Sequence, residues 1–318
     1  SLFSDIFSGK LTDAQIGAFM AALATKGETF EELAGAAEAM RREATRIQAA
    51  APVVVDTCGT GGDGAHTFNI STTAAFVVAG SGVTVAKHGN RSVSSKCGSA
   101  DVLEALGVKL NTAPEVAEEA VNEIGIGFLF APLFHGAMKY AIGPRKELAV
   151  RTIFNMLGPL TNPAAANCQI LGVFSPKLTE MFADALNMLG ARRAFVVHGH
   201  DGLDEISVCA PTRISELRDG RVHTYDISPE HFFEDRARPE DMAGGTPTEN
   251  ARITREILNG KEKGAKRNVV TINAGAALVA AGKAENLAGG VALAGQIIDS
   301  GKAVEKLDRL IEFTSANG

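Results

Sequence analysis

The stretch VVVDTCGTGGDG, residues 53–64, joins a short β-branched run to a loop in which four of six positions are glycine. Pro52 precedes the run and the glycines follow it, so residues 53–55 are predicted to form a buried strand. A helix pattern follows over about 71–79. A strand that passes through a glycine-rich turn into a helix indicates the first unit of an α/β domain.

Downstream of this unit, strand and helix patterns alternate, which is typical of an α/β fold with a mainly parallel central sheet flanked by helices. Expected strands cover 83–85, 126–130, 170–174 and 194–197, and expected helices cover about 99–106, 112–124, 137–157 and 178–189. Residues 212–225 are expected to form irregular strands around a turn at Asp219-Gly220, and the chain is expected to be mainly helical from residue 248.

The first fifty residues have a different pattern, with two helix starts and no strand-like run. Thr12 with Gln15, and Thr29 with Glu32, match the capping-box signature of a helix N-terminus. We predict a small all-helical subdomain over 1–50, to which helices from about 136–160 could be joined, and a large α/β domain over 51–318. The first helices are interpreted either as a dimerisation surface or as plain packing helices.

Length and composition exclude several classes of protein. The 318 residues suggest one large domain or two coupled ones, and 45% hydrophobic with 21% charged residues is close to the globular average. The 37 acidic and 31 basic residues leave a formal net charge of -6, which argues against a nucleic-acid coat or a polybasic membrane binder. The apolar stretch 74–85 is too short for a membrane span and contains glycines.

Cysteine spacing and the start of the sequence indicate a reduced, cytoplasmic protein. The four cysteines, at 58, 97, 168 and 209, lie too far apart for a zinc knuckle and are too few for a disulfide scaffold. No basic segment followed by an apolar run opens the sequence, so no signal peptide is expected.

The glycine-rich loop has the chemistry of a phosphate site. Glycines let the backbone approach a bulky anion, and the N-terminus of the following helix adds free N–H groups and a positive dipole. The loop is not a Walker motif, since no lysine follows its last glycine, and it does not fit GxGxxG. A tight turn with ordinary Ser and Thr caps is the alternative.

A second candidate loop, KHGNRSVSS at 87–95, directly follows the expected strand 83–85. In an open parallel sheet, ligands bind beyond the carboxyl ends of the strands, so both loops would border one crevice. Lys87, Arg91 and the serines suit a polyphosphate, through their charges and hydroxyl groups. The alternative is a solvated basic loop, which is less favoured beside the first loop in an acidic protein.

Two adjacent carboxylates, Asp204 and Glu205, follow the expected strand 194–197 and the sequence HGHDGL. Adjacent carboxylates on a loop are suitable ligands for Mg²⁺, which takes one or two carboxylates together with substrate phosphates and water. A solvated surface pair is the alternative. Zinc at His198 and His200 is not favoured, because no cysteine or third histidine lies nearby.

Five motifs occur together and in order: DTCGTGGDG, FNIST, KHGNRSVSSKCGSADVLEALG, RTIFNMLGPLTNP and GLDEIS. The combination resembles the anthranilate phosphoribosyltransferases of tryptophan biosynthesis, from about residue 12 to the end of the chain. The resemblance implies transfer of the 5-phosphoribosyl group of phosphoribosyl pyrophosphate (PRPP) to the amine of anthranilate, with release of pyrophosphate and use of Mg²⁺. It also implies a homodimer formed through the helical subdomain.

The resemblance implies a set of site residues as well. PRPP is expected to contact the glycine-rich loop, the FNIST run, the 87–95 loop and one further serine: Gly59, Gly62, Asp63, Thr67, Asn69, Ile70, Ser71, Thr72, Lys87, His88, Gly89, Asn90, Arg91, Ser92, Val93, Ser94, Ser95 and Ser99. Anthranilate is expected to contact Gly59, His88, Asn90, His135, Arg145, Gly158 and Pro159. The expected ligands of Mg²⁺ are Ser71, Asp204 and Glu205, and no residue is assigned as a general acid or base.

The chemistry of the residues agrees with these roles. Arg145 can bind the carboxylate of anthranilate through two hydrogen bonds, although GPRKE taken by itself is typical of a surface ion pair at a helix start. The Gly158-Pro159-Leu160 corner is expected to wall the aromatic ring. A pyrophosphate bound to Mg²⁺ departs without a protonating acid, so we expect a loose, oxocarbenium-like transition state and no covalent intermediate.

Two other functions fit parts of the sequence. A pyrimidine nucleoside phosphorylase shares the two-domain fold and has related loops, but the KHGNR stretch and the acidic pair favour a pyrophosphate substrate with a metal. A non-catalytic relative that binds nucleic acid is expected to be basic along one groove and to lack Arg145, which this acidic chain retains.

Overall fold

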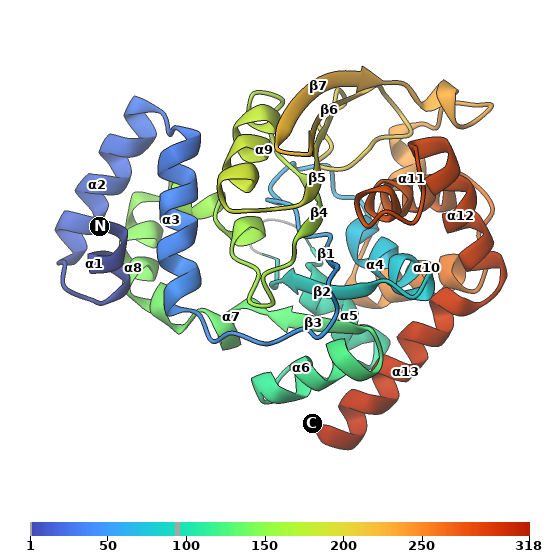
Figure 1. The fold of residues 1–318 in the computed structure, drawn as a ribbon, viewed down its shortest axis with the longest axis horizontal. Coiled ribbons are helices and arrows are strands. Elements are labelled where there is room, and N and C mark those ends of the chain that lie inside the picture. The colour runs from blue at the N-terminus through green and yellow to red at the C-terminus, as the bar shows by residue number, and fades with distance from the viewer. Residues whose placement is uncertain (1, 93–95) are drawn as a thin grey trace.

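The computed structural model describes residues 2–92 and 96–318, and shows a group of helices beside a sheet of seven strands (Figure 1). The expected PRPP contacts Val93, Ser94 and Ser95 lie outside the described residues. The strands are β1 (Val54–Asp56), β2 (Thr84–Gly89), β3 (Ile126–Phe130), β4 (Cys168–Gly172), β5 (Arg193–Gly199), β6 (Thr212–Arg218) and β7 (Arg221–Ile227).

The order of the strands in the sheet is β3-β2-β1-β4-β5-β6-β7. The first five of these are parallel to one another, and β6 and β7 are antiparallel to their neighbours. The expected α/β class with a mainly parallel central sheet is therefore confirmed.

Helices cover both faces of this sheet. The three N-terminal helices form a separate group with α8 (Lys139–Leu148) beside it (Figure 1). The N-terminal helices are α1 (Leu2–Phe7), α2 (Asp13–Lys26) and α3 (Phe30–Glu43). The remaining α-helices are α4 (Ile70–Gly80), α5 (Ser99–Leu106), α6 (Pro114–Glu123), α7 (Ala131–Phe134), α8 (Lys139–Leu148), α9 (Leu178–Met188), α10 (Pro247–Leu258), α11 (Ala265–Ala280), α12 (Leu287–Asp299) and α13 (Lys302–Asn317). Short 3₁₀ turns cover Gly136–Met138, Ile153–Asn155, Gly158–Leu160, Pro229–His231 and Pro239–Met242.

Alternating side chains bury both faces of the sheet. Phe195 and Val197 of β5 belong to the core that contains α4 and α11, whereas Ala194 and Val196 belong to the core under α9. Successive residues of a strand point to opposite faces, so a strand buried on both sides has an almost continuous apolar sequence. This explains why the parallel strands were recognisable as short apolar runs.

The N-terminal helices begin where their capping boxes predict. The Thr12 hydroxyl accepts from the Gln15 N–H, and the Thr29 hydroxyl accepts from the Glu32 N–H. Helix α2 packs on α8, and α3 packs on α9. One apolar core therefore runs from these helices to the face of the sheet under α9.

Pairing within the sheet corrects two expected strands. β2 continues to Gly89, so Lys87 and His88 lie in a strand and not in the following loop, because β2 pairs with β3 along its whole length from Val85 onward. β4 spans Cys168–Gly172, two residues earlier than expected, because these residues pair with β5.

The structure also defines two regions that the sequence outlined only coarsely. The helices expected near 137–157 are one α-helix, α8, and short 3₁₀ turns, since α8 ends just before Ala149, whose φ of +51° is left-handed. The 212–225 region is not irregular, because β6 and β7 pair in register from end to end around the Asp219-Gly220 turn. Among the described residues, no helix combines the length and the apolar character needed to cross a bilayer.

Candidate active site

The three polar segments singled out in the sequence meet beyond the carboxyl ends of β1, β2 and β5. The chain runs outward from β1 to β2 and β3, then returns to β4 on the other side of β1. In open α/β sheets such a reversal opens a crevice in which ligands bind. The glycine-rich loop and the acidic pair are joined there, since the Gly61 N–H donates to Asp204 Oδ2 over 2.9 Å.

The glycine-rich loop needs glycine for two different reasons. Gly61 and Gly62 have φ values of +67° and +80°, in the left-handed region. Gly59 lies against β4, where a Cβ would come within 2.9 Å of the Gly172 carbonyl oxygen. The neighbouring Thr60 N–H donates to that same carbonyl over 2.8 Å. The loop is therefore pressed against the end of β4 and presents backbone to the crevice.

The FNIST run forms the start of α4 and is attached to two other loops. The Ser71 N–H donates to Glu205 Oε1 over 3.1 Å. The Asn69 amide donates to the Cys97 carbonyl over 3.2 Å and accepts from the Asn250 amide over 3.0 Å. Asn69 thus connects α4 to the segment that precedes α5 and to α10.

Three other expected PRPP contacts around this helix have mainly structural surroundings. Ile70 and Thr72 are buried in the core beneath the helix. Thr67 forms an isolated bridge with Ala243. The structure therefore brings Ser71 of this run to the acidic pair, while the side chains of Ile70 and Thr72 point into the protein.

Lys87 carries a buried charge at the centre of the candidate site. Its side chain is 4% exposed, and Nζ lies 3.0 Å from the Thr57 hydroxyl and 3.5 Å from Ser71 Oγ. Nζ also donates to the Thr57 carbonyl over 3.2 Å. The ammonium group therefore ties β2 to the glycine-rich loop and to the start of α4.

Asp204 and Glu205 are half-buried beside a third carboxylate, Asp63. The Asp204 N–H lies 3.5 Å from Asp63 Oδ2. Burial, followed by the nearby negative charges, raises the pKa of both Asp204 and Glu205. Among the described residues, no group of three or more His, Cys, Asp or Glu side chains is arranged to hold a metal ion. The acidic pair is thus an incomplete set of oxygen ligands.

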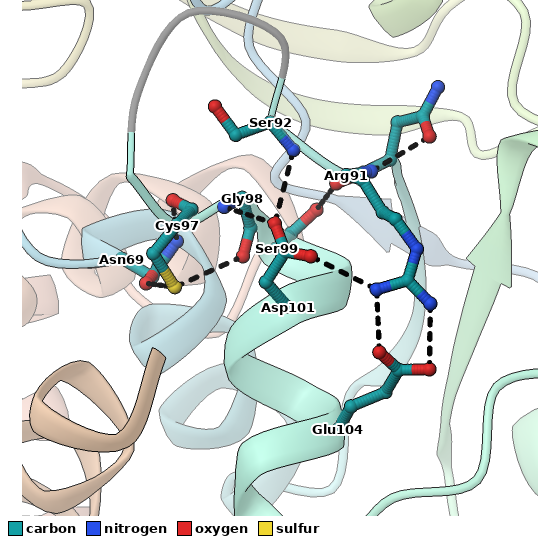
Figure 2. Close-up of polar contacts among 9 residues, drawn as sticks. Asn69, Arg91, Ser92, Cys97, Gly98, Ser99, Asp101 and Glu104 are labelled. Carbon is teal, nitrogen blue, oxygen red and sulfur yellow. Dashed lines mark hydrogen bonds and ion pairs between the residues drawn. The ribbon is translucent and has the colours of Figure 1, made fainter. Parts of the chain in front are cut away.

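Arg91 turns toward the first turn and the side of α5 (Figure 2). Its guanidinium contacts both oxygens of Glu104, at 2.6 and 2.8 Å, and Asp101 Oδ1 at 3.0 Å. Asp101 also accepts from the N–H groups of Ser92 and Gly98, at 3.2 and 2.8 Å. In this arrangement the Arg91 guanidinium forms ion pairs with two carboxylates of α5.

Hydrogen bonds hold the backbone of Asn90 and Arg91 in place. Ser99 Oγ donates to the Asn90 carbonyl over 3.1 Å, and the Asn90 side chain accepts from the Arg91 N–H over 2.7 Å. Gly89 ends β2 at this point. The residues on both sides of 93–95 are therefore anchored at the start of α5.

Three of the expected anthranilate residues, His88, His135 and Gly158, lie together, whereas Gly59 lies against β4 and Asn90 beside the start of α5. The rings of His88 and His135 are 5.0 Å apart, and His88 Nδ1 lies 2.9 Å from the Gly158 carbonyl oxygen. His88 Nε2 is buried without a hydrogen-bond partner among the described residues. Burial lowers the pKa of His88 to about 4 and that of His135 to about 3, so both rings are neutral at pH 7.

Arg145 of α8 has no carboxylate partner within ion-pair distance in the part of the chain that the structure describes. It is half-buried, its guanidinium lies 5.7 Å from the centre of the Phe154 ring, and burial lowers its pKa. A half-buried cation without a counter-ion is suited to an anionic ligand, and a carboxylate fits the guanidinium fork.

Sequence patterns alone missed two residues of this region. Asp56, at the end of β1, is fully buried and accepts from the N–H groups of Cys58 and His88, at 3.0 and 3.1 Å. Arg151 donates to the Gly62 carbonyl over 2.6 Å. Asp56 is the first residue of the motif DTCGTGGDG, and Arg151 is the first residue of RTIFNMLGPLTNP. Their places in these motifs were the signal that could have identified them.

Comparison with known protein families and curated proteins gives consistent matches. Residues 51–304 match the glycosyl transferase family α/β domain, and residues 1–44 match the helical bundle domain of the same family. The chain is 89% identical to anthranilate phosphoribosyltransferase of Desulfosudis oleivorans over 317 residues, covering 100% of this chain and 94% of that protein. It is 68% identical to the enzyme of the same name from Syntrophobacter fumaroxidans, with the same coverage.

Solved structures give the same match at the level of the fold. Anthranilate phosphoribosyltransferase from Thermus thermophilus superposes with a TM-score of 0.94 at 45% identity, covering 99% of this chain and 94% of that chain. The enzyme from Saccharomyces cerevisiae in complex with PRPP and Mg has a TM-score of 0.88 at 31% identity, covering 96% and 86%. The same yeast enzyme has also been solved in complex with 4-fluoroanthranilate, with a TM-score of 0.86 at 30% identity, covering 99% and 90%.

Proposed function

This chain belongs to the anthranilate phosphoribosyltransferase family, and from that premise we propose how its crevice carries out the reaction of the family. The reaction transfers the 5-phosphoribosyl group of PRPP to the amine of anthranilate, which yields N-(5-phosphoribosyl)anthranilate and pyrophosphate. The observation that carries the proposal is the meeting of a glycine-rich loop, a buried lysine and an acidic pair at the strand-order reversal.

The PRPP side of the crevice is formed by the glycine-rich loop, the start of α4 and the end of β2. Backbone N–H groups of the loop and of the helix N-terminus favour phosphate oxygens. The buried Lys87 ammonium supplies a fixed positive charge next to them. Arg91 and the residues around it reach the phosphates only after the contacts with Glu104 and Asp101 are given up.

The donor set at this position fits Mg²⁺. The carboxylates of Asp204 and Glu205 and the Ser71 hydroxyl are hard oxygen ligands, and too few to enclose an ion without others. Mg²⁺ usually keeps waters and takes substrate phosphates, which supply the missing ligands. The crowding of Asp63 against the acidic pair also favours a cation there. When bound, the ion neutralises the negative charge that develops on pyrophosphate.

Anthranilate is proposed to occupy the side of the crevice between the sheet and α8. Arg145 binds its carboxylate, since the guanidinium has no counter-ion among the described residues. Asn90, His88 and His135 contact the polar edge of the ring, while the Gly158-Pro159 corner and Gly59 enclose its faces.

The two histidines are neutral, so each ring has one nitrogen that can donate a hydrogen bond and one that can accept one. His88 Nδ1 faces a carbonyl oxygen and must carry the proton, so Nε2 holds the lone pair. Nε2 can therefore accept a hydrogen bond from the amine and orient it toward the ribose. Since the amine is uncharged and pyrophosphate is a stable leaving group, orientation and electrostatic stabilisation account for catalysis without a covalent intermediate.

Domain organisation and assembly are part of the proposal. We place a helical subdomain at 1–50, joined by helices within 136–160, beside a phosphoribosyl-binding α/β domain at 51–318. A homodimer through the helical subdomain is supported by apolar side chains on that side of the molecule, with Leu2, Tyr140 and Ile142 being 42%, 37% and 45% exposed. A cytoplasmic location agrees with a biosynthetic enzyme.

A single assay tests the proposed function. The protein is mixed with PRPP, Mg²⁺ and anthranilate, and the release of pyrophosphate is measured. We expect release that requires all three components. Release of ribose phosphate from a pyrimidine nucleoside and inorganic phosphate, with no reaction of PRPP, would instead identify a nucleoside phosphorylase.

A further inference from the structure

The corner at Gly158–Leu160 has all three of its carbonyl groups bound by side chains from three different elements. The glycine carbonyl faces His88 Nδ1 of β2 at 2.9 Å. The proline carbonyl accepts from Gln169 Nε2 of β4 at 2.8 Å. The leucine carbonyl accepts from Arg41 Nε of α3 at 2.7 Å. The corner is therefore held by the sheet on one side and by the N-terminal helices on the other.

Side chains are needed at this corner because the backbone supplies few hydrogen-bond donors to its carbonyl groups. A single 3₁₀ turn leaves most of its carbonyls without partners, and the proline has no N–H. Among the described residues, no backbone N–H donates to the Pro159 carbonyl. The Gln169 amide is the group that fixes this carbonyl in place.

Gln169 places a buried amide in an apolar strand, with one of its two polar atoms unpartnered among the described residues. It lies within β4, is 1% exposed, and its neighbours Ile170 and Leu171 belong to the apolar cores on the two faces of the sheet. Its Oε1 atom is buried with no partner among the described residues. A buried acceptor without a partner destabilises the fold, so the amide is retained at a cost, and what it supplies is the one donor to the Pro159 carbonyl among the described residues.

We propose that Gln169 is a positioning residue for the anthranilate side of the active site. Its amide holds the Pro159 carbonyl, and with it the corner that faces the aromatic ring. β4 pairs with β1 at Asp56, and Asp56 accepts from Cys58 at the start of the glycine-rich loop. The corner is thereby set at a fixed distance from the PRPP loops. The inference rests on the proposed function, in which this corner walls anthranilate.

The test uses Gln169→Met, which keeps the length of the side chain and removes the donor. We expect the KM for anthranilate to rise by about fivefold to tenfold, as for loss of one hydrogen bond at the ring wall, with the KM for PRPP changed by less than about twofold. The melting temperature should stay the same or fall, because the change removes the unpartnered Oε1 but leaves the Pro159 carbonyl without its donor. Amide hydrogen exchange of a peptide covering 157–165 should become faster.

Asn167→Leu is the matched control. Asn167 directly precedes β4, and its amide likewise donates to a carbonyl, that of Pro52, over 2.9 Å. This contact is at the opposite edge of the sheet from the loops, so the control should lower the melting temperature and leave both KM values unchanged. Gln169→Leu replaces Gln169→Met if the methionine variant does not fold.

Three results would overturn the proposal: an unchanged anthranilate KM in Gln169→Met, a parallel rise of both KM values, or unchanged hydrogen exchange at 157–165. Failure of the proposed function gives a different result. In that case the wild-type protein releases no pyrophosphate with both substrates, and the exchange measurement still decides whether Gln169 holds the corner.

Discussion

Glu205 and Ser71, which are 134 residues apart in the sequence, are joined by a hydrogen bond from the Ser71 N–H to Glu205 Oε1 over 3.1 Å. The bond connects the acidic loop after β5 to the first turn of α4. The Ser71 hydroxyl lies 3.5 Å from the Lys87 ammonium. Two oxygen ligands of the proposed Mg²⁺ site and one phosphate-binding cation are thus parts of one network.

The double substitution Asp204→Asn with Glu205→Gln should lower turnover much more at limiting Mg²⁺ than at saturating Mg²⁺. The substitutions keep the shape of both side chains and remove the charges that would bind the ion. Initial rates over a Mg²⁺ titration measure the effect. Asp226→Asn, at an exposed carboxylate of β7, is the control and should follow the wild-type titration. An equal loss at every Mg²⁺ concentration would argue against a role in binding the metal.

Arg145→Ala should raise the KM for anthranilate by about tenfold or more and leave the KM for PRPP nearly unchanged, since a charged hydrogen-bonded pair contributes about 1.5–3 kcal/mol. Steady-state kinetics with each substrate varied in turn measures both constants. Lys146→Ala removes the adjacent, exposed cation of α8 and should change neither constant. A mutant with a normal anthranilate KM and impaired PRPP binding would reassign Arg145.

Gly61→Ala should weaken PRPP binding by about tenfold or more, with a loss of stability of about 1 kcal/mol. The φ of Gly61 is +67° and no atom of the described residues lies within 4 Å of an added Cβ, so the methyl group would project into the crevice. Gly220→Ala is a matched control, because Gly220 has a φ of +72° and equally open surroundings in the β6–β7 turn. Calorimetric titration with PRPP, together with melting of both variants, separates affinity from stability.

Ser71→Ala should weaken the binding of Mg²⁺ and PRPP together while leaving the melting temperature nearly unchanged. The hydroxyl faces Lys87 at the edge of the crevice, and a methyl group cannot replace it as an oxygen ligand. If the hydroxyl served only the helix start, the variant would lose about 0.5–2 kcal/mol of stability and keep its affinity for PRPP. Calorimetric titration at fixed Mg²⁺ measures the change.

The histidine pair predicts a specific dependence of stability on pH. The pKa of His135 is lowered by burial from 6.5 to about 3 in the folded protein, so the unfolded chain takes up a proton first as the pH falls. The contribution of His135 to the free energy of unfolding should therefore decrease below about pH 6.5, by about 1.4 kcal/mol for each pH unit.

The test compares wild type with His135→Phe, because buried carboxyl groups titrate in the opposite sense. The pKa of Asp56 is raised by burial to about 6, so its protonation favours the folded state as the pH falls below that value. Subtracting the two unfolding curves removes this common effect. As the pH falls from 6.5 to about 4.5, we expect the free energy of unfolding of His135→Phe to increase relative to that of wild type, as measured by urea unfolding. Parallel curves would show that His135 is not held neutral.

Local patterns predicted the elements whose boundaries are sharp in the sequence. β3 and α5 agree with expectation at both ends, because an apolar run between turn residues and an amphipathic pattern with a following glycine are local signals. The strand β2 was expected to end four residues early, since KHG has little strand character. Parallel pairing with β3 extends it, and that pairing is a tertiary contact.

The partners of two buried amide side chains had no comparable signal. Gln169 is a lone amide in an apolar strand, and Asn162 meets Asp56 across 106 residues of sequence. Gln169 lies outside the five motifs, and nothing in the local pattern distinguishes it from an accidental polar residue. Asn162 belongs to the motif RTIFNMLGPLTNP, but the motif does not tell which side chain it meets. Their partners follow only from the strand order and from the path of the 157–164 segment across the sheet.

The five motifs in their order along the chain resemble those of one family, and that resemblance was sufficient to predict the family and the reaction, with which the residue types agree. Which atoms meet was decided by the fold. The contacts of Glu205 with Ser71, of Arg91 with Glu104 and of Gln169 with Pro159 depend on how strands from distant parts of the chain lie beside one another. A one-dimensional pattern carries the chemistry of each side chain, whereas distance and burial arise only when the sheet and helices pack.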